Sequence, residues 1–408
     1  MIHIAILGHG VVGSGVAEVL LKNADSITGK AGERINIRRI LDLREFPDSP
    51  FADRFTKDFE EIVNDKEISI VVETMGGLKP AYDFVKRCLL AGKSVVTSNK
   101  ELVAAKGDEL LEIAKNSNLN FMFEASVGGG IPILRPIDQC LAANDVDLIA
   151  GILNGTTNYM LTQMIEADMS FEDALAMAQK LGYAERDPSA DVGGHDACRK
   201  VCILASLAFG KHVYPEQVKT EGIESVTLTD VKYAAAWGGV IKLIGSVRKL
   251  ESGKLLCLVA PMFLPKDSLL ADVRDVFNGI MVHGDAIGDV MFYGRGAGKL
   301  PTASAVVADV IDEIKHMSTR KTLFWERGSE DYVVTDWEGH YFLRFAGEEA
   351  AVVAKAADVF GDVSVIKAHD VPAGEVALMT PVLSETALES ALAKMGTAPV
   401  SKIRVANL

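Results

Sequence analysis

A charged segment at residues 181–200 reads LGYAERDPSADVGGHDACRK and lies between two helix-like segments. It holds four carboxylates and a lysine that could do chemistry, namely Glu185, Asp187, Asp191, Asp196 and Lys200. Asp196 and Lys200 are four residues apart at the start of an apolar run, so they share one face of a helix that enters the core. A lysine in that place is partly desolvated and could transfer protons, whereas the alternative is a solvated ion pair at a helix start.

A glycine turn follows the first apolar run of the chain. Residues 2–7 are apolar apart from His3, and the next six residues read GHGVVG before a helix-like segment begins. In a strand, turn and helix of this kind Gly8 makes the tight turn, Gly10 lets the backbone approach a pyrophosphate, and Gly13 allows close packing of the helix on the strand. The pattern predicts a dinucleotide site, and the alternative is a glycine-rich turn of an ordinary α/β protein.

Composition narrows the class of protein. The chain has 408 residues, enough for two or three domains, and its 49% hydrophobic and 24% charged content is typical of a globular protein. A net charge of −14 without a basic stripe excludes nucleic-acid binding as a main task and favours a small substrate. The N-terminal apolar run is too short for a signal peptide, and no run approaches the ~18 to 20 apolar residues of a membrane span.

Cysteine number and spacing are typical of a cytosolic protein. The five cysteines are odd in number and lack a C-x-x-C pair: Cys88, Cys140, Cys198, Cys202 and Cys257. This pattern indicates reduced thiols. We therefore expect a soluble, cytoplasmic protein.

The first region of the chain alternates strands and helices. Strands are predicted at residues 2–7, 35–41, 68–72, 94–97 and 120–124, with helices at 81–90 and 107–115 after the helix of the glycine turn. This alternation predicts an α/β, Rossmann-type doubly wound parallel sheet within residues 1–130. Its ligand would lie beyond the carboxyl ends of the strands, where the polar segments 73–77 and 98–100 occur.

The second region, residues 131–300, is predicted to be an α+β domain for substrate binding and dimerisation. It contains NGTTN at residues 154–158, a helix at 171–181, and strands at 255–264 and near 279–283 that indicate an antiparallel or mixed sheet. A glycine-rich passage precedes a helix at 303–313. We expect residues 301–325 to rejoin the first domain.

The third region follows a polar linker at residues 315–335. Its strands are predicted at residues 341–345, 363–366, 375–382 and 400–405, and its helices at 350–360 and 385–395. This β-α-β-β-α-β order predicts a ferredoxin-like unit over residues 338–408. Such a sheet can pair with its copy through an edge strand or a face, so the alternating apolar residues of 400–405 predict a contact between subunits.

Seven motifs occur in a fixed order along the chain: GHGVVG, VETMGG, SNKELVA, EASVGGGIPI, ILNGTTNYM, LGYAERDPSADVGGHDACRK and GRGAGKLPTASAVVADV. In this set the chain resembles homoserine dehydrogenase, in its monofunctional form with a C-terminal ACT domain, nearly from end to end. The resemblance implies an oxidoreductase that uses NAD or NADP to interconvert L-homoserine and L-aspartate 4-semialdehyde in threonine, methionine and isoleucine biosynthesis. It also implies a homodimer or a homotetramer.

The same resemblance implies roles for individual residues. Lys200 matches the catalytic acid and base, Asp196 its partner, and Lys100 the lysine at the cofactor. The substrate-binding positions are Gly155, Thr156, Tyr183, Glu185 and Asp191. The cofactor-binding positions are Gly8, Gly10, Val11, Val12, Gly13, Asp42, Thr74, Lys100 and Gly298. These types suit the chemistry, because an ammonium can stabilise and protonate a developing alkoxide while carboxylates accept hydrogen bonds from a substrate ammonium.

A loop after the first region matches the family's monovalent-cation site. The resemblance implies that Glu124, Val127, Gly129 and Ile131 hold sodium, mainly through backbone carbonyls, which are ligands that suit a hard cation. Without the resemblance, the loop is interpreted about equally well as a glycine-rich hinge. No cluster of cysteine and histidine indicates zinc.

Two positions depart from the family pattern. Asp42, at the end of the second strand, is typical of the ribose-binding carboxylate of NAD sites, where many relatives place a basic residue for the 2′-phosphate of NADP. Arg39 and Arg44 could compensate, so the choice between NAD and NADP stays open. Residues 347–351 read GEEAA in place of the usual Asp-x-Pro-Gly ligand loop of ACT domains. This predicts a role in assembly more than in sensing an amino acid.

Two other hypotheses stay open on the sequence alone. Another amino-acid dehydrogenase on the same scaffold would share the dinucleotide motif but lack the spacing of Glu185, Asp196 and Lys200. A non-enzymatic, dinucleotide-sensing regulatory protein would use its C-terminal unit to contact partners and would show no turnover of L-homoserine.

Overall fold

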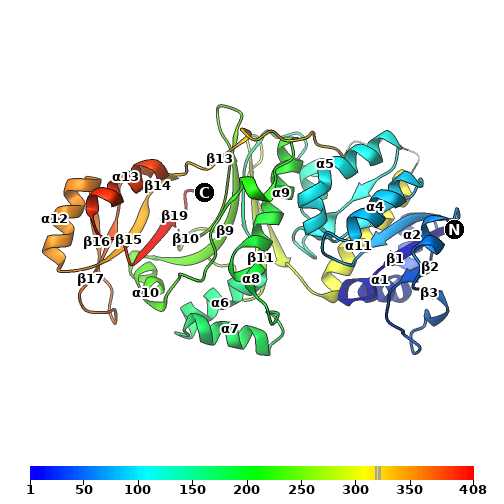
Figure 1. Ribbon diagram of the computed structural model, residues 1–408, viewed down its shortest axis with the longest axis horizontal. Coiled ribbons are helices and arrows are strands. Elements are labelled where there is room, and N and C mark those ends of the chain that lie inside the picture. Colours follow the sequence, from blue (N-terminus) through cyan, green and yellow to red (C-terminus); the bar gives the residue numbers. More distant parts are fainter. Residues whose placement is uncertain (318, 320–322) are drawn as a thin grey trace. The chain divides into compact units, whose positions relative to one another are not determined.

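The structure is a computed structural model that describes residues 1–317, 319 and 323–408. The chain divides into two compact units, which can be followed by colour and label in Figure 1. Unit 1 comprises Met1–Asp145, Cys202–Pro215 and Phe292–Ser329, and unit 2 comprises Val146–Val201, Glu216–Met291 and Glu330–Leu408. Residues 318 and 320–322 of the expected polar linker lie outside the described residues.

Unit 1 is built on a six-stranded sheet with the order β3-β2-β1-β4-β5-β6. The strands are β1 (Ile2–Leu7), β2 (Ile35–Leu41), β3 (Phe55–Thr56), β4 (Ile68–Glu73), β5 (Ser94–Thr97) and β6 (Phe121–Met122). All of their pairings are parallel, so the predicted doubly wound parallel sheet is confirmed. The strand order reverses between β1 and β4, which is where such sheets bind ligands.

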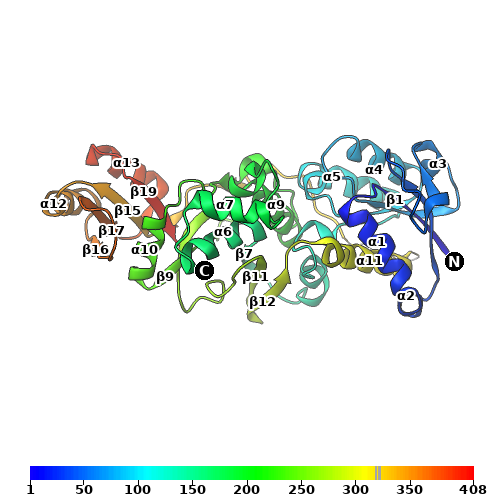
Figure 2. The same ribbon diagram turned by 90° about the horizontal axis from the view of Figure 1, so that it is seen from below.

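Helices cover both faces of the unit 1 sheet, with α4 and α5 on one face and α1 and α11 on the other (Figure 2). The helices are α1 (Val11–Lys22), α2 (Ala24–Ala31), α3 (Glu60–Val63), α4 (Ala81–Leu90), α5 (Lys100–Asn116) and α11 (Lys299–His316). α1 and α11 touch closely, because an ideal Cβ at Gly15 would lie 2.8 Å from the Lys299 carbonyl oxygen. Their inner faces share one core with the apolar residues of β1 and β4.

Unit 2 contains a mixed sheet with the strand order β12-β11-β7-β9-β10-β19-β15-β17-β16. These strands are β7 (Val146–Ile152), β9 (Gly239–Lys249), β10 (Leu255–Pro265), β11 (Phe277–Gly284), β12 (Gly288–Arg295), β15 (Tyr341–Ala346), β16 (Ser364–Ile366), β17 (Glu375–Met379) and β19 (Ser401–Val405). Short strands β8 (Lys219–Thr220) and β13 (Val333–Val334) pair with β10, and β14 (Glu338–Gly339) pairs with β18 (Leu383–Ser384).

The helices of the second half of the chain are α6 (Gly155–Glu166), α7 (Phe171–Lys180), α8 (Ser189–Val192), α9 (His195–Phe209), α10 (Leu228–Trp237), α12 (Glu349–Phe360) and α13 (Glu385–Met395). The predicted β-α-β-β-α-β order is present as β15-α12-β16-β17-α13-β19. Alternate residues of β15 face opposite helices, since the Phe342 ring packs near Tyr233 of α10 while Leu343 shares a core with Leu388 of α13. We call residues 338–408 the C-terminal module.

The expected free edge at residues 400–405 is not an edge. β19 pairs antiparallel with β15 on one side and parallel with β10 on the other, with Met262 opposite Arg404 and Phe263 opposite Val405. The prediction that this strand pairs with a second subunit as a free edge is therefore wrong, while a contact between subunits through the face of the sheet stays a prediction. Apolar alternation shows that a strand has partners but not which strand supplies them, and here the partner is distant in the chain.

Several other predicted boundaries differ, two of them next to expected site residues. α5 begins at Lys100 instead of residue 107, because Asn99 caps it by accepting a hydrogen bond from the Leu102 N–H at 3.1 Å. The strand predicted at residues 120–124 is only β6, and a 3₁₀ turn follows at Glu124–Ser126. Among the described residues, none of the helices is both long and apolar enough for a membrane span.

Removing residues 338–408 should unfold much of unit 2 instead of releasing an active catalytic part. The deletion takes β19 away from β10 and exposes Met262 and Leu258, which share one core cluster with Leu343 and Leu388. Each large apolar side chain exposed in this way costs about 1.5–3 kcal/mol. We expect an insoluble product or one without a cooperative melt, measured by circular dichroism against the full chain. A control that lacks only residues 406–408 should melt normally, and a stable, active product of the long deletion would contradict the prediction.

Candidate functional site

The glycine turn of unit 1 forms a cradle of backbone groups. Gly8 has a φ of +93°, a conformation that side-chain-bearing residues rarely adopt, and an ideal Cβ at Gly13 would lie 2.0 Å from the Gly8 carbonyl oxygen. An ideal Cβ at Gly10 would meet nothing within 4 Å, so this position opens outward at the start of α1. The Thr74 hydroxyl donates to the Gly8 carbonyl at 2.9 Å and holds the turn. These residues fit a pyrophosphate at a helix N-terminus.

Glu73 organises the neighbouring loop at the carboxyl end of β4. Its buried carboxylate accepts hydrogen bonds from the Thr97 hydroxyl at 2.6 Å and from the Met75 N–H at 2.7 Å. Burial raises the pKa of Glu73, and these hydrogen bonds oppose the rise. Asn99 donates to the Gly77 carbonyl at 2.6 Å, so the loop is fixed at both ends. The expected polar segments 73–77 and 98–100 are thereby brought together.

Lys100 is the first residue of α5 and is half-buried. A cation at a helix N-terminus is at the unfavourable end of the helix dipole, since the unpaired N–H groups there attract anions. A bound anionic ligand at this end of α5 would offset that unfavourable interaction.

Asp42 lies at the end of β2 beside the glycine turn. It accepts hydrogen bonds from the His9 N–H at 2.8 Å and from the guanidinium of Arg44 at 2.8 and 2.9 Å. The hydrogen bonds from Arg44 hold the pKa of the Asp42 carboxyl well below its usual range, although burial opposes them. Arg39 instead contacts Glu61 at 3.2 Å. Of the two arginines considered from the sequence, Arg44 is the one at Asp42.

The other expected cofactor positions lie around the same turn. Val11 and Val12 are the first residues of α1, and Gly298 is the N-cap of α11 with a φ of +125°. Lys299, the next residue, forms an ion pair with Glu18 of α1 at 2.7 Å. Gly298 is therefore held at the face of α1 by a segment distant in the sequence.

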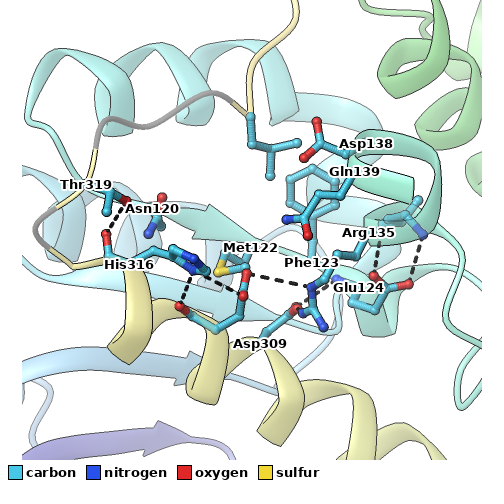
Figure 3. A pocket seen from close by; sticks show the side chains of 13 residues that line it. Asn120, Met122, Phe123, Glu124, Arg135, Asp138, Gln139, Asp309, His316 and Thr319 are labelled. Carbon is cyan, nitrogen blue, oxygen red and sulfur yellow. Dashed lines mark hydrogen bonds and ion pairs between the residues drawn. The ribbon is translucent and has the colours of Figure 1, made fainter. Parts of the chain in front are cut away.

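The loop expected to hold a cation is clamped by two buried carboxylates of unit 1 (Figure 3). Glu124 accepts hydrogen bonds from the N–H groups of Ile133 and Arg135, both at 2.7 Å, and Asp309 of α11 accepts one from the Glu124 N–H at 2.8 Å. Burial, with Glu124 nearby, raises the pKa of Asp309 to about 8, and Arg135 opposes the rise. Asp309 was not singled out from the sequence, because nothing local marks it.

The Glu124 carboxylate is thus occupied by backbone N–H groups, which leaves backbone carbonyls as the groups of this loop suited to a cation. Gly129 has a φ of +55°, and an ideal Cβ there would lie 2.2 Å from the Gly296 carbonyl oxygen, so only glycine fits. Val127 and Ile131 are buried beside it. Among the described residues, no group of three or more histidine, cysteine or acidic side chains is placed to hold a metal ion.

The buried ion pair of unit 2 is the one predicted from the four-residue spacing. The Lys200 amine donates to Asp196 at 2.7 Å and to the Leu153 carbonyl at 2.6 Å, and the two residues are 7% and 4% exposed. The alternative of a solvated pair at a helix start is therefore wrong. A buried lysine needs such partners, because desolvation penalises an unpaired charge.

Asn154 joins this pair to the preceding charged turn. Its side-chain amide donates to Asp191 at 2.7 Å and to Asp196 at 2.9 Å, while its side-chain oxygen caps α6 by accepting from the Thr157 N–H at 2.8 Å. We call Leu153, Asn154, Asp191, Asp196 and Lys200 the Asn154 cluster. The sequence motif contains Asn154, but its bridging role was missed, since the carboxylates that it joins are distant in the chain.

The remaining substrate positions adjoin the start of α6. Thr156 donates from its hydroxyl to the Tyr183 carbonyl at 2.6 Å, and the exposed Tyr183 ring packs edge-on against Tyr159 at 5.1 Å. Gly155 has no room for a side chain, because an ideal Cβ would lie 2.7 Å from the Val276 carbonyl oxygen. Glu185, two residues after Tyr183, is exposed. It is not part of the Asn154 cluster, because the hydrogen bonds found for the Asn154 amide in the described part of the chain go to Asp191 and Asp196.

Lys242 is a buried lysine behind α6 that the sequence did not reveal. Its amine donates to the Asn158 side-chain oxygen at 3.0 Å and to the Val273 carbonyl at 2.6 Å. Asn158 in turn donates to the carbonyls of Val273, Asp275 and Phe277. These hydrogen bonds attach residues 273–277, which contact Gly155, to α6.

A parallel sheet with a glycine cradle at its reversal point, in a chain that also buries a lysine–carboxylate pair, defines a dinucleotide-dependent dehydrogenase. Residues 8–124 match the family model described as "Homoserine dehydrogenase, NAD binding domain", and residues 132–311 match that described as "Homoserine dehydrogenase". The chain belongs to the homoserine dehydrogenase family.

Individual relatives agree with this assignment. The homoserine dehydrogenase of Synechocystis sp. is 46% identical over 318 residues, which cover 76% of this chain and 73% of the relative. The crystal structure of a homoserine dehydrogenase from Thiobacillus denitrificans matches with a TM-score of 0.87 at 35% identity and covers 100% of this chain and 98% of that one. A hyperthermophilic archaeal homoserine dehydrogenase in complex with NADPH matches with a TM-score of 0.67 at 28% identity, over 78% and 99% of the two chains.

The protein is accordingly a homoserine dehydrogenase, an NAD(P)-dependent oxidoreductase, as the seven motifs predicted. The match covers both the dinucleotide region and the region of the Asn154 cluster. Neither the non-enzymatic alternative nor another amino-acid dehydrogenase has comparable support.

The free energy of unfolding of the wild type, minus that of a Lys242→Met variant, should increase as the pH rises from about 8 to 10.5. Burial, with Arg274 nearby, lowers the pKa of Lys242 from 10.5 to about 8. Between these values the unfolded chain binds a proton that the folded chain does not, so the free energy of unfolding rises with pH. The gain across the window is on the order of 3 kcal/mol. Urea unfolding at several pH values measures it.

The exposed Lys266 lines the same cavity as Lys242, so Lys266→Met is the matched control for this experiment. This control should keep the pH dependence of the wild type. Parallel curves for the wild type and Lys242→Met would show that the Lys242 amine does not lose its proton in this window.

Proposed function

We propose that Lys200 is the general acid and base for the interconversion of L-homoserine and L-aspartate 4-semialdehyde. The nicotinamide cofactor supplies or accepts the hydride at the reacting carbon when it is bound. In the reducing direction the Lys200 ammonium stabilises the alkoxide that develops on the substrate oxygen and donates its proton there, and in the oxidising direction the amine takes the proton back. The burial of this amine against Asp196 and the Leu153 carbonyl carries the proposal.

Asp196 acts on the reaction through Lys200. A carboxylate at 2.7 Å favours the charged form of the lysine and so offsets the desolvation that burial imposes on it. Asn154 fixes the direction of the carboxylate, since its amide donates to the same Asp196 oxygen as the lysine does. The Leu153 carbonyl accepts a second hydrogen bond from the ammonium and so fixes the direction of the amine.

Substrate recognition is assigned to the start of α6 and the turn that contacts it. We propose that Glu185 and Asp191 accept hydrogen bonds from the substrate ammonium, and that Gly155, Thr156 and Tyr183 enclose the amino-acid end. The hydrogen bond from Thr156 to the Tyr183 carbonyl supports a shared role for these segments. The exposure of Glu185 supports contact with a ligand, since its carboxylate is accessible to a substrate ammonium.

The cofactor is assigned to the glycine turn and its neighbours. Backbone N–H groups at Gly10, Val11, Val12 and Gly13 would bind the pyrophosphate, with Gly8 and Thr74 shaping the turn. Gly298 closes the same region from α11. Lys100 would act as the lysine at the cofactor, and its place at a helix N-terminus supports this role.

Cofactor preference is assigned to Asp42. A carboxylate at the end of the second strand binds a ribose 2′-hydroxyl and repels a 2′-phosphate, so we propose that NAD is preferred to NADP. Arg44 is the competing influence. Its guanidinium donates two hydrogen bonds to the Asp42 carboxylate, whose negative charge weakens the attraction of Arg44 for a phosphate.

We propose that the carbonyls of Glu124, Val127, Gly129 and Ile131 hold a sodium ion. The clamping of this loop by Glu124 and Asp309 supports it, because a hard cation needs oxygen ligands at fixed positions. The ion would act by holding the loop.

The C-terminal module is proposed to be an ACT-like module that serves the integrity of unit 2 more than amino-acid sensing. Glu348 supports this view, because its own carboxylate accepts hydrogen bonds from the Ala350 and Ala351 N–H groups, at 3.1 and 2.9 Å, at the position of the usual ligand loop. Three further statements stay predictions: a role in threonine, methionine and isoleucine biosynthesis, assembly as a homodimer or homotetramer, and a cytoplasmic location.

Lys200→Met should lower the turnover of L-homoserine by roughly 100- to 10,000-fold, the usual size of a general acid–base contribution. Binding of NAD should be unchanged, because Lys200 is assigned to the substrate oxygen and not to the cofactor. Initial rates give the first quantity and quenching of protein fluorescence gives the second. Lys180→Met, at the exposed end of α7, is the control and should keep full activity. An unchanged kcat in Lys200→Met would refute the assignment.

Asp42→Ala should raise the ratio of kcat/KM for NADP to that for NAD by about 10-fold, which corresponds to about 1.4 kcal/mol of differential transition-state binding. The reason is that the variant removes the carboxylate that repels a 2′-phosphate and frees Arg44. Glu45→Ala removes an exposed carboxylate three residues away and serves as the control. A strong native preference for NADP would mean that Arg44 dominates this site.

A further inference from the structure

A buried ion cluster joins the C-terminal module to the middle of unit 2. Arg404 on β19 is 1% exposed and donates to both carboxylate oxygens of Glu221, at 2.6 and 2.9 Å, and to Glu385 at 2.6 Å. Burial opposes ionisation of Glu221 and Glu385, but the hydrogen bonds from Arg404 hold the pKa of each carboxyl group below its ordinary value. A two-point pair of arginine and carboxylate fixes direction as well as distance.

The segment that carries Glu221 lies directly against the turn before α9. The Glu221 N–H donates to the Val259 carbonyl of β10 at 2.7 Å, and the Ile223 N–H donates to the Val192 carbonyl at 2.8 Å. At Gly222 an ideal Cβ would lie 2.1 Å from the same Val192 oxygen, so the two backbones touch with no room for a side chain. A shift of residues 221–223 must therefore move Val192.

The turn at residues 192–194 separates the two carboxylates of the Asn154 cluster. Asp191 precedes the turn and Asp196 follows it, and the single amide of Asn154 binds both. The Gly194 carbonyl accepts from the Cys198 N–H at 2.9 Å and so begins the first turn of α9. The separation of the two carboxylates thus depends on where this turn is held.

We infer that Arg404 is a positioning residue for the substrate site. It fixes Glu221, and through the backbone of residues 221–223 it holds the 192–194 turn where Asn154 can reach Asp191 and Asp196 together. This inference rests on the proposed roles of the Asn154 cluster. It gives the C-terminal module a part in catalysis that needs no effector and no direct contact with the substrate.

Arg344 provides a matched control within the same module. It lies on β15, next to β19, and its side chain is 4% exposed against 2% for Arg404. It also pairs with two carboxylates, Asp230 at 3.2 Å and Glu375 at 2.5 Å. These partners belong to α10 and β17 and not to residues 221–223. Substituting either arginine therefore disturbs a comparable buried ion cluster, but only one of the two clusters adjoins the turn.

The experiment compares Arg404→Lys and Arg344→Lys in the full chain. Lysine keeps the charge but loses the two-point geometry. We expect Arg404→Lys to lower kcat/KM for L-homoserine by about 10- to 100-fold, the range that follows from a misplacement of about 1 Å. The kcat/KM of Arg344→Lys should stay within about twofold of that of the wild type, because this change leaves the site geometry intact. The dissociation constant for NAD should not change in either variant.

Hydrogen exchange followed by mass spectrometry gives a readout that does not depend on turnover. Amide protection in residues 189–200 should fall in Arg404→Lys and not in Arg344→Lys. If Arg404→Lys fails to fold, the double variant Arg404→Met/Glu221→Leu removes both charges, while Lys219 still contacts Glu385 at 2.5 Å. It should fold and show the same loss of activity and of protection.

Each outcome bears on a distinct claim. The inference would be overturned if both arginine variants lost activity in proportion to the fall in their melting temperatures. Arg404 would then contribute to the stability of the fold and not specifically to the site. Unchanged protection at residues 189–200 would also overturn it. A Lys200→Met variant that retains full turnover would instead overturn the proposed function of the cluster, whatever the Arg404 variants do.

Discussion

The burial of one ion pair, Lys200 with Asp196, constrains much of unit 2. A charged pair that is almost inaccessible to water is tolerated only if its remaining donors and acceptors are also bound. The Leu153 carbonyl and the Asn154 amide meet that need, and both lie at the start of α6. The position of α6 relative to α9 therefore follows from the requirements of the pair. The segments assigned to substrate binding are attached to these two helices, so their geometry follows as well.

In unit 1, buried carboxylates are stabilised by hydrogen bonds from backbone groups instead of by cations. Glu73 and Glu124 are buried without a hydrogen bond from an arginine or lysine side chain among the described residues, and their carboxylates accept hydrogen bonds mainly from backbone N–H groups. Each carboxylate thereby fixes a loop that has no regular secondary structure of its own. One loop adjoins the glycine turn and the other is the expected cation loop. The side chains of these buried acids thus hold the backbone of two loops that are assigned to ligand binding.

Local patterns predicted those parts of the fold that depend on neighbouring residues. The bounds of α4 and β5 and the glycine turn follow from apolar spacing and from residues at their ends, and the structure agrees with them. The pairing of β19 with β10 could not be predicted in this way, because alternation does not identify a distant partner. The same limit applies to the site. The spacing of Asp196 and Lys200 was visible in the sequence, whereas the bridge from Asn154 to Asp191 required the fold.

The residues assigned to chemistry occupy positions that the fold alone would not favour. Lys100 lies at the end of α5 where the helix dipole opposes a cation, and Lys200 lies in a core position where desolvation opposes it. A neutral residue at position 200 would leave Asp196 buried without its cation, so the lysine and the carboxylate must be kept together. Arg404 differs from both lysines in its proposed role, because it is assigned to no ligand and its two carboxylate partners hold a backbone segment in place. Its ion cluster supports structure, whereas the two lysines lie where a substrate or cofactor would complete the arrangement.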